Sequence, residues 1–351
     1  MQTLTKFSEG LKTIPAGITW YLTDIAEAKG KQDLYSNQSP QKLKTLREHA
    51  LVESAISSNR IEGVEIDRKR VGTVIFGRPL LKDRNEEEIQ GYHDALKWIH
   101  SENKTIHFNE TTIMKLHQMS RGKIWDSGKY KEKDSDIIER LPNGDTRVRF
   151  KTVSAENTPQ AMKELIFLYD EITKTKVVHP LLAIAACSLD FLCIHPFRDG
   201  NGRVSRLLLL LQLYHAGYEV GRYISLERLI EEHKERYYET LEISSQRWHE
   251  GKHDPWAYIN FLLYIVKKAY SEFVERVKKI EAPKGAKTEL IIEQIQQMKG
   301  EFTLSQLHSK CPEVSRDMVR KVLKDLQKIE IVVATGRGVA ARWRKKGITS
   351  L

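Results

Sequence analysis

The chain has 351 residues, of which 40% are hydrophobic, and its 57 Lys and Arg against 47 Asp and Glu give a net charge of +10, so it is long enough for two domains with ordinary cores. Its three cysteines, Cys187, Cys193 and Cys311, have no C-x-x-C spacing, which argues against a disulfide framework and fits a reducing compartment. Residues 1–15 lack an apolar signal region and the leucine run 207–211 is far too short to span a bilayer, so we expect a soluble, cytoplasmic protein with no membrane partner.

The first helix of the main body is predicted from its end signals. Residues 1–38 mix apolar residues with several glycines, and we expect them to wrap around the core without forming a domain of their own. Ser39 and Pro40 form a good helix start, an N-cap followed by proline at the first helical position. The helix should run over about residues 40–62, and Gly63 is a plausible stop.

The next segment predicts two helices between residues 85 and 122. Asn85 with Glu88 looks like an N-cap with a reach-back acid, and Asn109 looks like the start of the second helix. The histidines of this region, including His117, show no spacing typical of a metal site.

A β-hairpin is predicted over residues 135–150. Ile137, Ile138 and the run from Val148 favour strands, and the intervening loop contains Asn143-Gly144, a strong hairpin signal. A lone hairpin in a helical chain is marginally stable. We therefore expect it to pack against the body or to serve a purpose.

The rest of the body is predicted to be helical. Residues 154–194 give two helices, the second starting at His179-Pro180, and a helix at 201–215 is apolar on all sides and therefore central. Further helices are expected over 225–248 and 255–280. The body thus runs over residues 39–280 and the fold class is mainly α.

Residues 284–351 form a basic tail, with 14 Lys and Arg against 7 Asp and Glu. Helices are expected at 288–299, 303–309 and 315–330, followed by a two-stranded wing at 331–334 and 339–343. This pattern resembles a small C-terminal winged-helix (α+β) domain, a fold that often places its third helix in a DNA groove. Its basic residues there lie largely outside the apolar face, namely Arg316, Arg320, Lys321 and Lys324. A basic protein-contact module, including one for homodimerisation, is the alternative.

The most informative stretch is His195–Arg206, a polar turn between the apolar runs 181–194 and 207–213. Gly200 and Gly202 allow a tight turn and close approach of a ligand, and the residue between them, Asn201, tolerates left-handed dihedrals. The helix that begins here directs its free N–H groups into the turn, which makes a phosphate cradle.

The remaining polar residues of this stretch add chemistry to the cradle. Arg203 and Arg206 lie three apart and could both bind phosphate oxygens. Asp199 is a hard oxygen ligand suited to Mg²⁺ beside substrate phosphates, and His195 can accept a proton near neutral pH. Together they indicate phosphoryl or nucleotidyl transfer. The alternatives are a capping or core histidine and an ordinary turn.

The stretch resembles the signature of the Fic family, H-x-F-x-D/E-G-N-G-R-x-x-R, and matches it at every defined position. The resemblance implies a Fic-type helical bundle and a protein adenylyltransferase, which moves AMP from the substrate ATP, with Mg²⁺, onto a Ser, Thr or Tyr hydroxyl of a protein or of the chain itself. His195 would be the general base and Asp199 would hold Mg²⁺.

The same resemblance implies roles for the residues that follow Asp199. Gly200, Asn201 and Gly202 would bind phosphates through backbone N–H groups, and Arg203 and Arg206 would hold the β- and γ-phosphates. The related Doc kinases carry lysine at the position of Gly202, so glycine there favours AMP transfer over phosphorylation.

Ser58, Glu62 and Gly63 resemble the inhibitory motif of Fic proteins, S/T-x-x-x-E-G/N. The resemblance implies that Glu62 pairs with Arg206 and weakens or misplaces ATP, which places the chain in the N-terminally inhibited subclass. The alternative is an ordinary surface glutamate near a helix end.

The hairpin resembles the Fic flap, where a target segment adds as a strand; Ile137, Ile138 and Val148 would be its docking residues, and a purely structural hairpin is the alternative. Tyr237 and Tyr238 lie where family members place an aromatic against adenine. Ser244 and Ser245 stand where an asparagine often follows, which puts hydrogen bonding to adenine in doubt.

Two other functions stay open from the sequence. One is a DNA-binding regulator in which the Fic body only senses a nucleotide. The other is the reverse reaction, removal of AMP from a target, with Glu62 positioning water.

Overall fold

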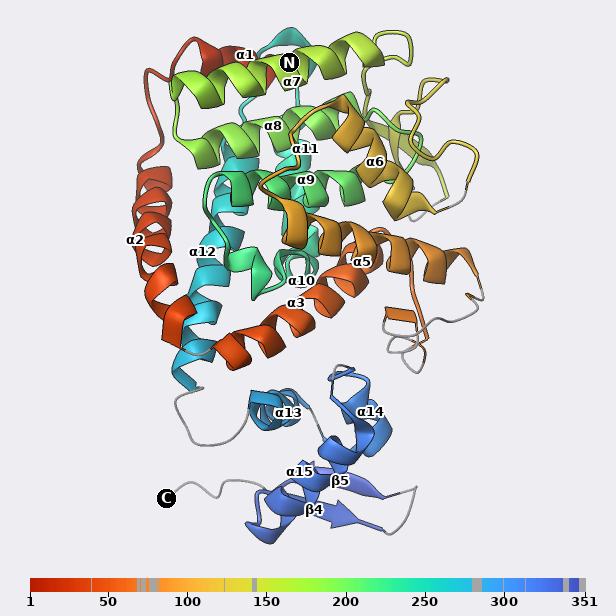
Figure 1. Cartoon of the computed structure of the whole chain (residues 1–351). Coiled ribbons are helices and arrows are strands. Elements are labelled where there is room, and N and C mark those ends of the chain that lie inside the picture. The colour runs from red at the N-terminus through yellow and green to blue at the C-terminus, as the bar shows by residue number, and fades with distance from the viewer. Residues whose placement is uncertain are drawn as a thin grey trace.

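The computed structural model describes residues 1–38, 40–67, 70, 74–75, 81, 83–122, 124–140, 144–279, 286–298, 300–312, 314–336 and 341–346, and it is mainly helical (Figure 1). The helices are α1 (Gln2–Ser8), α2 (Ala16–Gln38), α3 (Pro40–Ile61), α5 (Arg84–Glu102), α6 (Glu110–Arg121), α7 (Thr158–Thr175), α8 (Pro180–Ile194), α9 (Asn201–His215), α10 (Leu226–Glu232), α11 (Lys234–Ser245), α12 (Trp256–Lys279), α13 (Ala286–Gln297), α14 (Leu304–His308) and α15 (Arg316–Lys328), with short 3₁₀ helices η1 (Val220–Arg222) and η2 (Trp248–Glu250). The strands are β1 (Ile137–Arg140), β2 (Thr146–Phe150), β3 (Phe302–Thr303), β4 (Val332–Thr335) and β5 (Arg342–Lys345).

Helices α8 and α9 form the centre of the body, as the apolar runs on both sides of the polar turn predict. Every residue of α8 from Leu181 to Ile194 is buried, and the residues of α9 from Arg203 to Tyr214 are buried as well. Helices α7, α6, α5 and α12 pack around this pair (Figure 1). The polar turn between α8 and α9 is therefore held between two buried, closely packed helices.

The ends of α3 follow the predicted signals. The helix begins at Pro40, and Ser39 lies outside the described residues. At its C-terminus Gly63 adopts a left-handed φ of 81°, and the N–H groups of Gly63 and Val64 donate to the carbonyls of Arg60 (3.0 Å) and Asn59 (2.9 Å). This is a Schellman motif. It places Glu62 directly after the last residue of α3, where its side chain can point away from the helix.

The cap predicted for α5 is wrong. Asp83, not Asn85, accepts a hydrogen bond from the N–H of Glu86, at 3.0 Å, and α5 begins at Arg84. Glu88 does not reach back to the cap because it is buried among arginines. The cap of α6 is the predicted Asn109, which accepts from the N–H of Thr112 at 2.8 Å.

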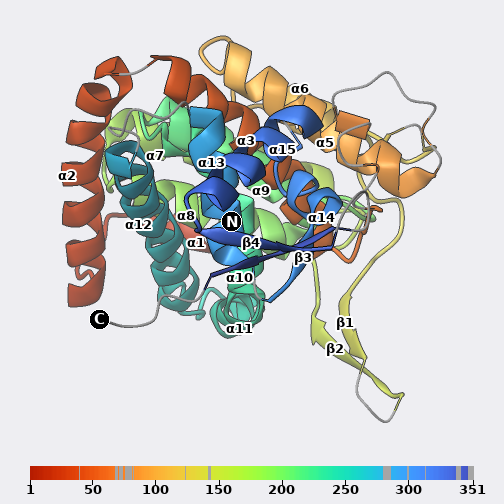
Figure 2. The same ribbon diagram turned by 90° about the horizontal axis from the view of Figure 1, so that it is seen from below.

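The N-terminal segment is helical and tied to the centre. The N–H groups of Thr3 and Leu4, at the start of α1, donate to the carboxylate of Asp190 on α8 at 3.0 and 2.9 Å. A side chain of a distant helix thus supplies the cap that α1 lacks locally. Helix α2 lies along α12 (Figures 1 and 2).

The predicted helix over 225–248 is three elements, α10, α11 and η2, because the chain departs from helical geometry at His233 (φ −117°, ψ 32°). All three cysteines are buried, and none of them forms a disulfide within the described part of the chain. Within the described part of the chain, no helix has both the length and the apolar character needed to cross a membrane.

The predicted hairpin is present as β1 and β2, which pair antiparallel with Ile138 opposite Val148. Gly144 takes a left-handed φ of 90° in the turn, and Asn143 lies outside the described residues. The hairpin extends from the helical body (Figure 2). Arg149 on β2 anchors it to α11 by donating to the carbonyl of Tyr238 at 2.7 Å and pairing with Glu242 at 2.8 Å.

The tail forms its own core from α13, α14, α15 and a three-stranded sheet in the order β3-β5-β4, beside α3 (Figure 1). Thr303 and Gln306 make the predicted capping box. Helix α15 ends at Lys328, two residues before the expected end, and Ile329 just beyond it is 56% exposed. Strand β3 was not predicted.

Candidate active site

The loop between α8 and α9 is fixed by two left-handed residues and one side chain. His195 ends α8 with φ 53°, and Gly200 precedes α9 with φ 86°. The side-chain amide of Asn201 accepts from the N–H of Phe197 at 2.9 Å and donates to its carbonyl at 2.7 Å. The predicted left-handed role of Asn201 is wrong, because this residue is the first of α9; its side chain closes the loop instead.

His195 is half-buried and directed into a cavity. Burial, followed by the charge of Lys131, lowers the pKa of His195 to about 4. Its Nδ1 lies 3.4 Å from the carbonyl oxygen of Leu192, an acceptor, which favours the proton on Nδ1. The imidazole is therefore neutral near pH 7 and its Nε2 is available to accept a proton.

The cavity has a volume of about 470 Å³ and lies between the loop, α11, the end of α3 and the hairpin. Of the site residues predicted from the sequence, those that line this cavity are Glu62, Ile137, Ile138, His195, Gly202, Tyr237 and Tyr238. Asp199, Gly200, Asn201, Arg203, Arg206, Ser58 and Val148 are not among its lining residues. Ile138 and Val148 are 58% and 50% exposed on the hairpin.

Glu62 and Ser58, one turn apart at the end of α3, both bind Arg206. The Nη2 of Arg206 donates to Glu62 Oε1 at 2.8 Å and to the carbonyl of Ser58 at 2.9 Å, and its Nε donates to Ser58 Oγ at 2.9 Å. Burial alone would lower the pKa of Arg206, but the carboxylate of Glu62 raises it well above its ordinary value. The pair is a charge-assisted contact shielded from water on the arginine side.

Gly202 has helical backbone angles, so glycine is needed here for lack of room for a side chain and not for its conformational freedom. A Cβ at this position would lie 2.2 Å from Glu62 Oε1 and 3.1 Å from Arg206 Nη1. Arg206 Nη1 is buried and has no hydrogen-bond partner among the described residues. The Nη1 of Arg206, a positively charged hydrogen-bond donor, thus lies next to the backbone of Gly202 in the N-terminal turn of α9.

The two tyrosines of α11 differ. Tyr237 is buried and packs against Tyr258 and Phe261, whereas Tyr238 is half-buried and its hydroxyl donates to the carbonyl of Ile61 at 3.2 Å. Burial raises the pKa of the Tyr237 hydroxyl. Ser245 lines the cavity, but Ser244 is buried and bonded to the N–H of Tyr258.

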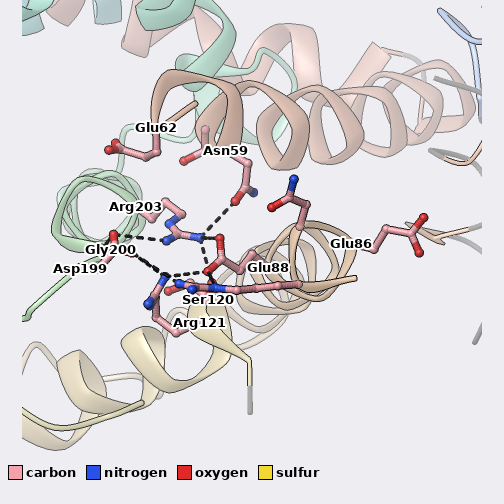
Figure 3. Close-up of polar contacts among 12 residues, drawn as sticks. Asn59, Glu62, Glu86, Glu88, Ser120, Arg121, Asp199, Gly200 and Arg203 are labelled. Carbon is pink, nitrogen blue, oxygen red and sulfur yellow. Dashed lines mark hydrogen bonds and ion pairs between the residues drawn. The ribbon is translucent and has the colours of Figure 1, made fainter. Parts of the chain in front are cut away.

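Arg203 lies in a buried ionic cluster behind the loop, together with Glu88, Arg121 and Asp199 (Figure 3). Its Nη1 donates to Glu88 Oε2 at 2.7 Å and to Asn59 Oδ1 at 3.3 Å, and the residue is 1% exposed. The Nη1 of this guanidinium is therefore already bonded to protein groups, whereas its Nε is buried without a hydrogen-bond partner among the described residues. Contact of Arg203 with a phosphate stays a prediction.

The carboxylate of Asp199 is 55% exposed. Its Oδ1 accepts from the N–H of Gly200 at 2.6 Å, and its Oδ2 lies 2.8 Å from Arg121 Nη1. Burial alone would raise the pKa of Asp199, but Arg121 and Arg203 lower it below its usual value. The ionised carboxylate keeps lone pairs directed to solvent.

Among the described residues, no three His, Cys, Asp or Glu side chains gather closely enough to hold a metal ion alone. Mg²⁺ commonly binds through one or two carboxylates, water and substrate phosphates. The single exposed, ionised carboxylate of Asp199 beside the start of α9 fits that kind of site.

Sequence reasoning assigned no role at the loop to four residues that support it, namely Glu88, His117, Arg121 and Lys131. The ammonium of Lys131 donates to Thr152 Oγ1 at 2.7 Å and to the carbonyl of Ile194 at 3.3 Å, and burial lowers its pKa to about 8. A buried lysine or arginine carries no local sequence signal, because its partners lie on other elements.

Comparisons with known proteins agree with this geometry. Residues 107–213 match the model of the Fic/DOC family. The protein adenylyltransferase Fic of Aedes aegypti is 23% identical over 225 residues, 62% of this chain and 42% of that protein, and the protein adenylyltransferase fic-1 of Caenorhabditis elegans is 29% identical over 151 residues, 42% and 27% respectively. A Fic family protein from Desulfovibrio desulfuricans G20 has a similar crystal structure, with a TM-score of 0.62 at 22% identity over 97% of this chain and 98% of that chain. The chain spans less than half the length of these curated relatives, and the structural likeness establishes a shared fold.

Proposed function

We propose that this chain, which carries a Fic domain, is a self-inhibited protein adenylyltransferase that transfers AMP from ATP to a protein hydroxyl. The observation that carries the proposal is a neutral His195 opening into the same cavity as Gly202 and Glu62, with Arg206 directly behind them. A proton acceptor and an anion-binding helix start thus share one cavity.

In the proposed reaction the hydroxyl oxygen of the target attacks the α-phosphorus of ATP. The new bond joins that oxygen to phosphorus, the bridging bond between the α-phosphorus and the departing oxygen breaks, and pyrophosphate leaves with the electron pair. The hydroxyl proton moves to Nε2 of His195. The N–H groups at the start of α9, from Asn201 and Gly202, and the guanidinium of Arg206 stabilise charge on the phosphates.

Asp199 would hold Mg²⁺, which when bound neutralises phosphate charge and favours departure of pyrophosphate. The protein's own contribution is to present one ionised carboxylate, fixed by Gly200 and Arg121, at the edge of the loop.

Glu62 would inhibit the enzyme by occupying Arg206. The 2.8 Å contact uses a donor that the terminal phosphates of ATP need, and the carboxylate repels a polyanion that enters the cavity. The exposed Ile138 and Val148 of the hairpin support docking of a target segment as an added strand. The target would be a protein, the chain itself included.

A second candidate function rests on the tail. Exposed basic residues lie on α15 and β5, namely Arg316, Arg320, Lys321, Lys324, Arg342, Arg344 and Lys345. We propose this winged-helix-like module as a surface for nucleic acid, with homodimer contact as the alternative, and we propose a cytoplasmic location for the whole chain.

The decisive experiment supplies ATP labelled at either the α- or the γ-phosphate to the Glu62→Gly variant with Mg²⁺ and a protein lysate. We expect protein labelling above that of the lysate alone from α-labelled ATP only, and none above that background from either form after His195→Ala is added. Labelling from γ-labelled ATP would indicate a kinase. No labelling, with salt-sensitive duplex binding that responds to ATP, would support the regulator instead.

The pH dependence of the same variant tests the role of His195. Because the imidazole has a pKa lowered to about 4, it is already deprotonated in the neutral range, and removing the charge of Glu62 lowers that pKa further. We expect the initial rate of labelling at saturating ATP to stay nearly constant from about pH 8 to pH 5 and to fall only as pH drops toward 4. An inflection near the ordinary histidine value of about 6.5 would contradict this expectation.

A further inference from the structure

Helix α6 faces the catalytic loop with His117, whose ring makes two directed hydrogen bonds. Its Nδ1 is 2.9 Å from the N–H of Gly128, and its Nε2 is 3.0 Å from the carbonyl oxygen of Asp199. The N–H of Gly128 can only donate, so Nδ1 is unprotonated, and Nε2 carries the hydrogen that it donates to Asp199. The ring also stacks on Phe197, with centroids 3.8 Å apart and planes at 5°.

Arg121 lies one helical turn further along α6 and reaches the side chain of the same aspartate. Its Nη1 is 2.8 Å from Asp199 Oδ2 and 2.6 Å from Glu88 Oε1 (Figure 3). A Cβ on Gly200 would lie 2.9 Å from Arg121 Cδ, so the arginine also packs directly against the start of α9. One helix therefore fixes both the peptide and the carboxylate of Asp199.

We propose that His117 and Arg121 are positioning residues that hold Asp199 ready for magnesium–nucleotide binding, an inference that rests on the proposed function. Because the carboxylate is 55% exposed, polar contacts and not core packing orient it. Arg121 pairs with Oδ2 at 2.8 Å, the N–H of Gly200 donates to Oδ1 at 2.6 Å and the exposed Arg84 lies 3.5 Å from Oδ2, while His117 holds the backbone carbonyl of the same residue. Neither residue lines the cavity, and both reach Asp199 from helix α6. Groups that orient a metal ligand typically contribute about 10- to 100-fold to metal affinity.

The two nitrogens of His117 can be separated by a matched pair of substitutions. In His117→Gln the side-chain amide can occupy the position of Nε2 and still donate to Asp199; in His117→Asn it can occupy the position of Nδ1 and still accept from Gly128. Both variants lose the stacking on Phe197. Each variant keeps one of the two hydrogen bonds, so a loss of affinity confined to His117→Asn reports the bond to Asp199 and not general stability.

The experiment measures the affinity of the Glu62→Gly protein for a fluorescent ATP analogue, with Mg²⁺ and with EDTA. We expect His117→Asn to weaken binding about 10-fold in Mg²⁺ and to leave binding in EDTA unchanged. His117→Gln should keep most of the parent's affinity in both conditions, and Asp199→Asn should reproduce the magnesium-specific loss. The Mg²⁺ concentration that gives half-maximal labelling should likewise rise in His117→Asn and Asp199→Asn and should change little in His117→Gln.

Equal weakening by the two His117 variants, or a loss that persists in EDTA, would overturn the inference. Arg121→Lys gives an independent arm, because the lysine side chain ends one bond short of the Nη1 atom that contacts both Glu88 and Asp199. We expect the same magnesium-specific loss, and an unchanged affinity would overturn the inference. A Glu62→Gly parent that binds the analogue no better with Mg²⁺ than with EDTA would overturn the proposed function itself, and the inference with it.

Discussion

Replacing Glu62 with glycine should raise the affinity for ATP and activate transfer of AMP. The substitution removes the carboxylate 2.8 Å from Arg206 Nη2 and leaves both bonds from Arg206 to Ser58 in place. The guanidinium thus stays oriented but gains a free donor next to Gly202. A hydrogen bond between charged groups is worth about 1.5–3 kcal/mol, which corresponds to roughly 10- to 150-fold in the dissociation constant.

The dissociation constants of the unmodified protein and of Glu62→Gly are measured by titration with a fluorescent ATP analogue. Labelling is then measured with α-labelled ATP at a concentration between these two dissociation constants. Glu65→Gly is the matched control, because Glu65 is an exposed glutamate three residues further on and its loss changes the net charge equally. Glu62→Gln separates charge from chain flexibility and should give an intermediate affinity. A dissociation constant that does not change in Glu62→Gly would refute inhibition by competition for Arg206.

The sequence predicted those features that depend on neighbouring residues. Pro40 and Gly63 mark the ends of α3, Asn109 caps α6, and Thr303 with Gln306 caps α14, because a cap forms within one helical turn. Where two residues could cap the same helix, local reasoning failed: Asp83 took the place expected for Asn85. The predicted reach-back acid, Glu88, is instead buried against Arg121 and Arg203 of other helices, which local reasoning could not foresee.

The candidate site shows the same contrast between features set by neighbouring residues and features set by residues far away in the chain. The motif indicated His195, Asp199 and Arg206 because their residue types and spacing carry the chemistry. The reason for glycine at 202 could not be read there, because the atom that excludes a side chain belongs to Glu62, far earlier in the chain. Likewise, the pairing of Arg203 with Glu88 could not be predicted from the motif, because Glu88 lies on another helix, and the contact of Arg203 with a phosphate stays a prediction.

Glu88→Gln should be the most destabilising conservative substitution in the body. Glu88 is 2% exposed and pairs with two fully buried guanidiniums, Arg121 at 2.6 Å and Arg203 at 2.7 Å. An amide of the same size cannot offset their charge, and breaking a buried ion pair by removing one partner costs about 3–5 kcal/mol. Urea unfolding should show a lower midpoint at an unchanged slope.

The half-buried Glu87 on the same helix provides the control, and Glu87→Gln should change the free energy of unfolding by less than about 0.5 kcal/mol. The double variant Glu88→Gln with Arg203→Gln should cost less than the sum of the two single variants, because removing both charges restores the balance around Arg121. Additive effects would mean that Glu88 and Arg203 are not energetically coupled, despite their 2.7 Å contact. This coupling matters for function, because the carboxylate of Glu88 neutralises Arg203 and also holds Arg121 against Asp199. The stability of this core and the orientation of the proposed metal ligand, Asp199, therefore depend on the same buried charge.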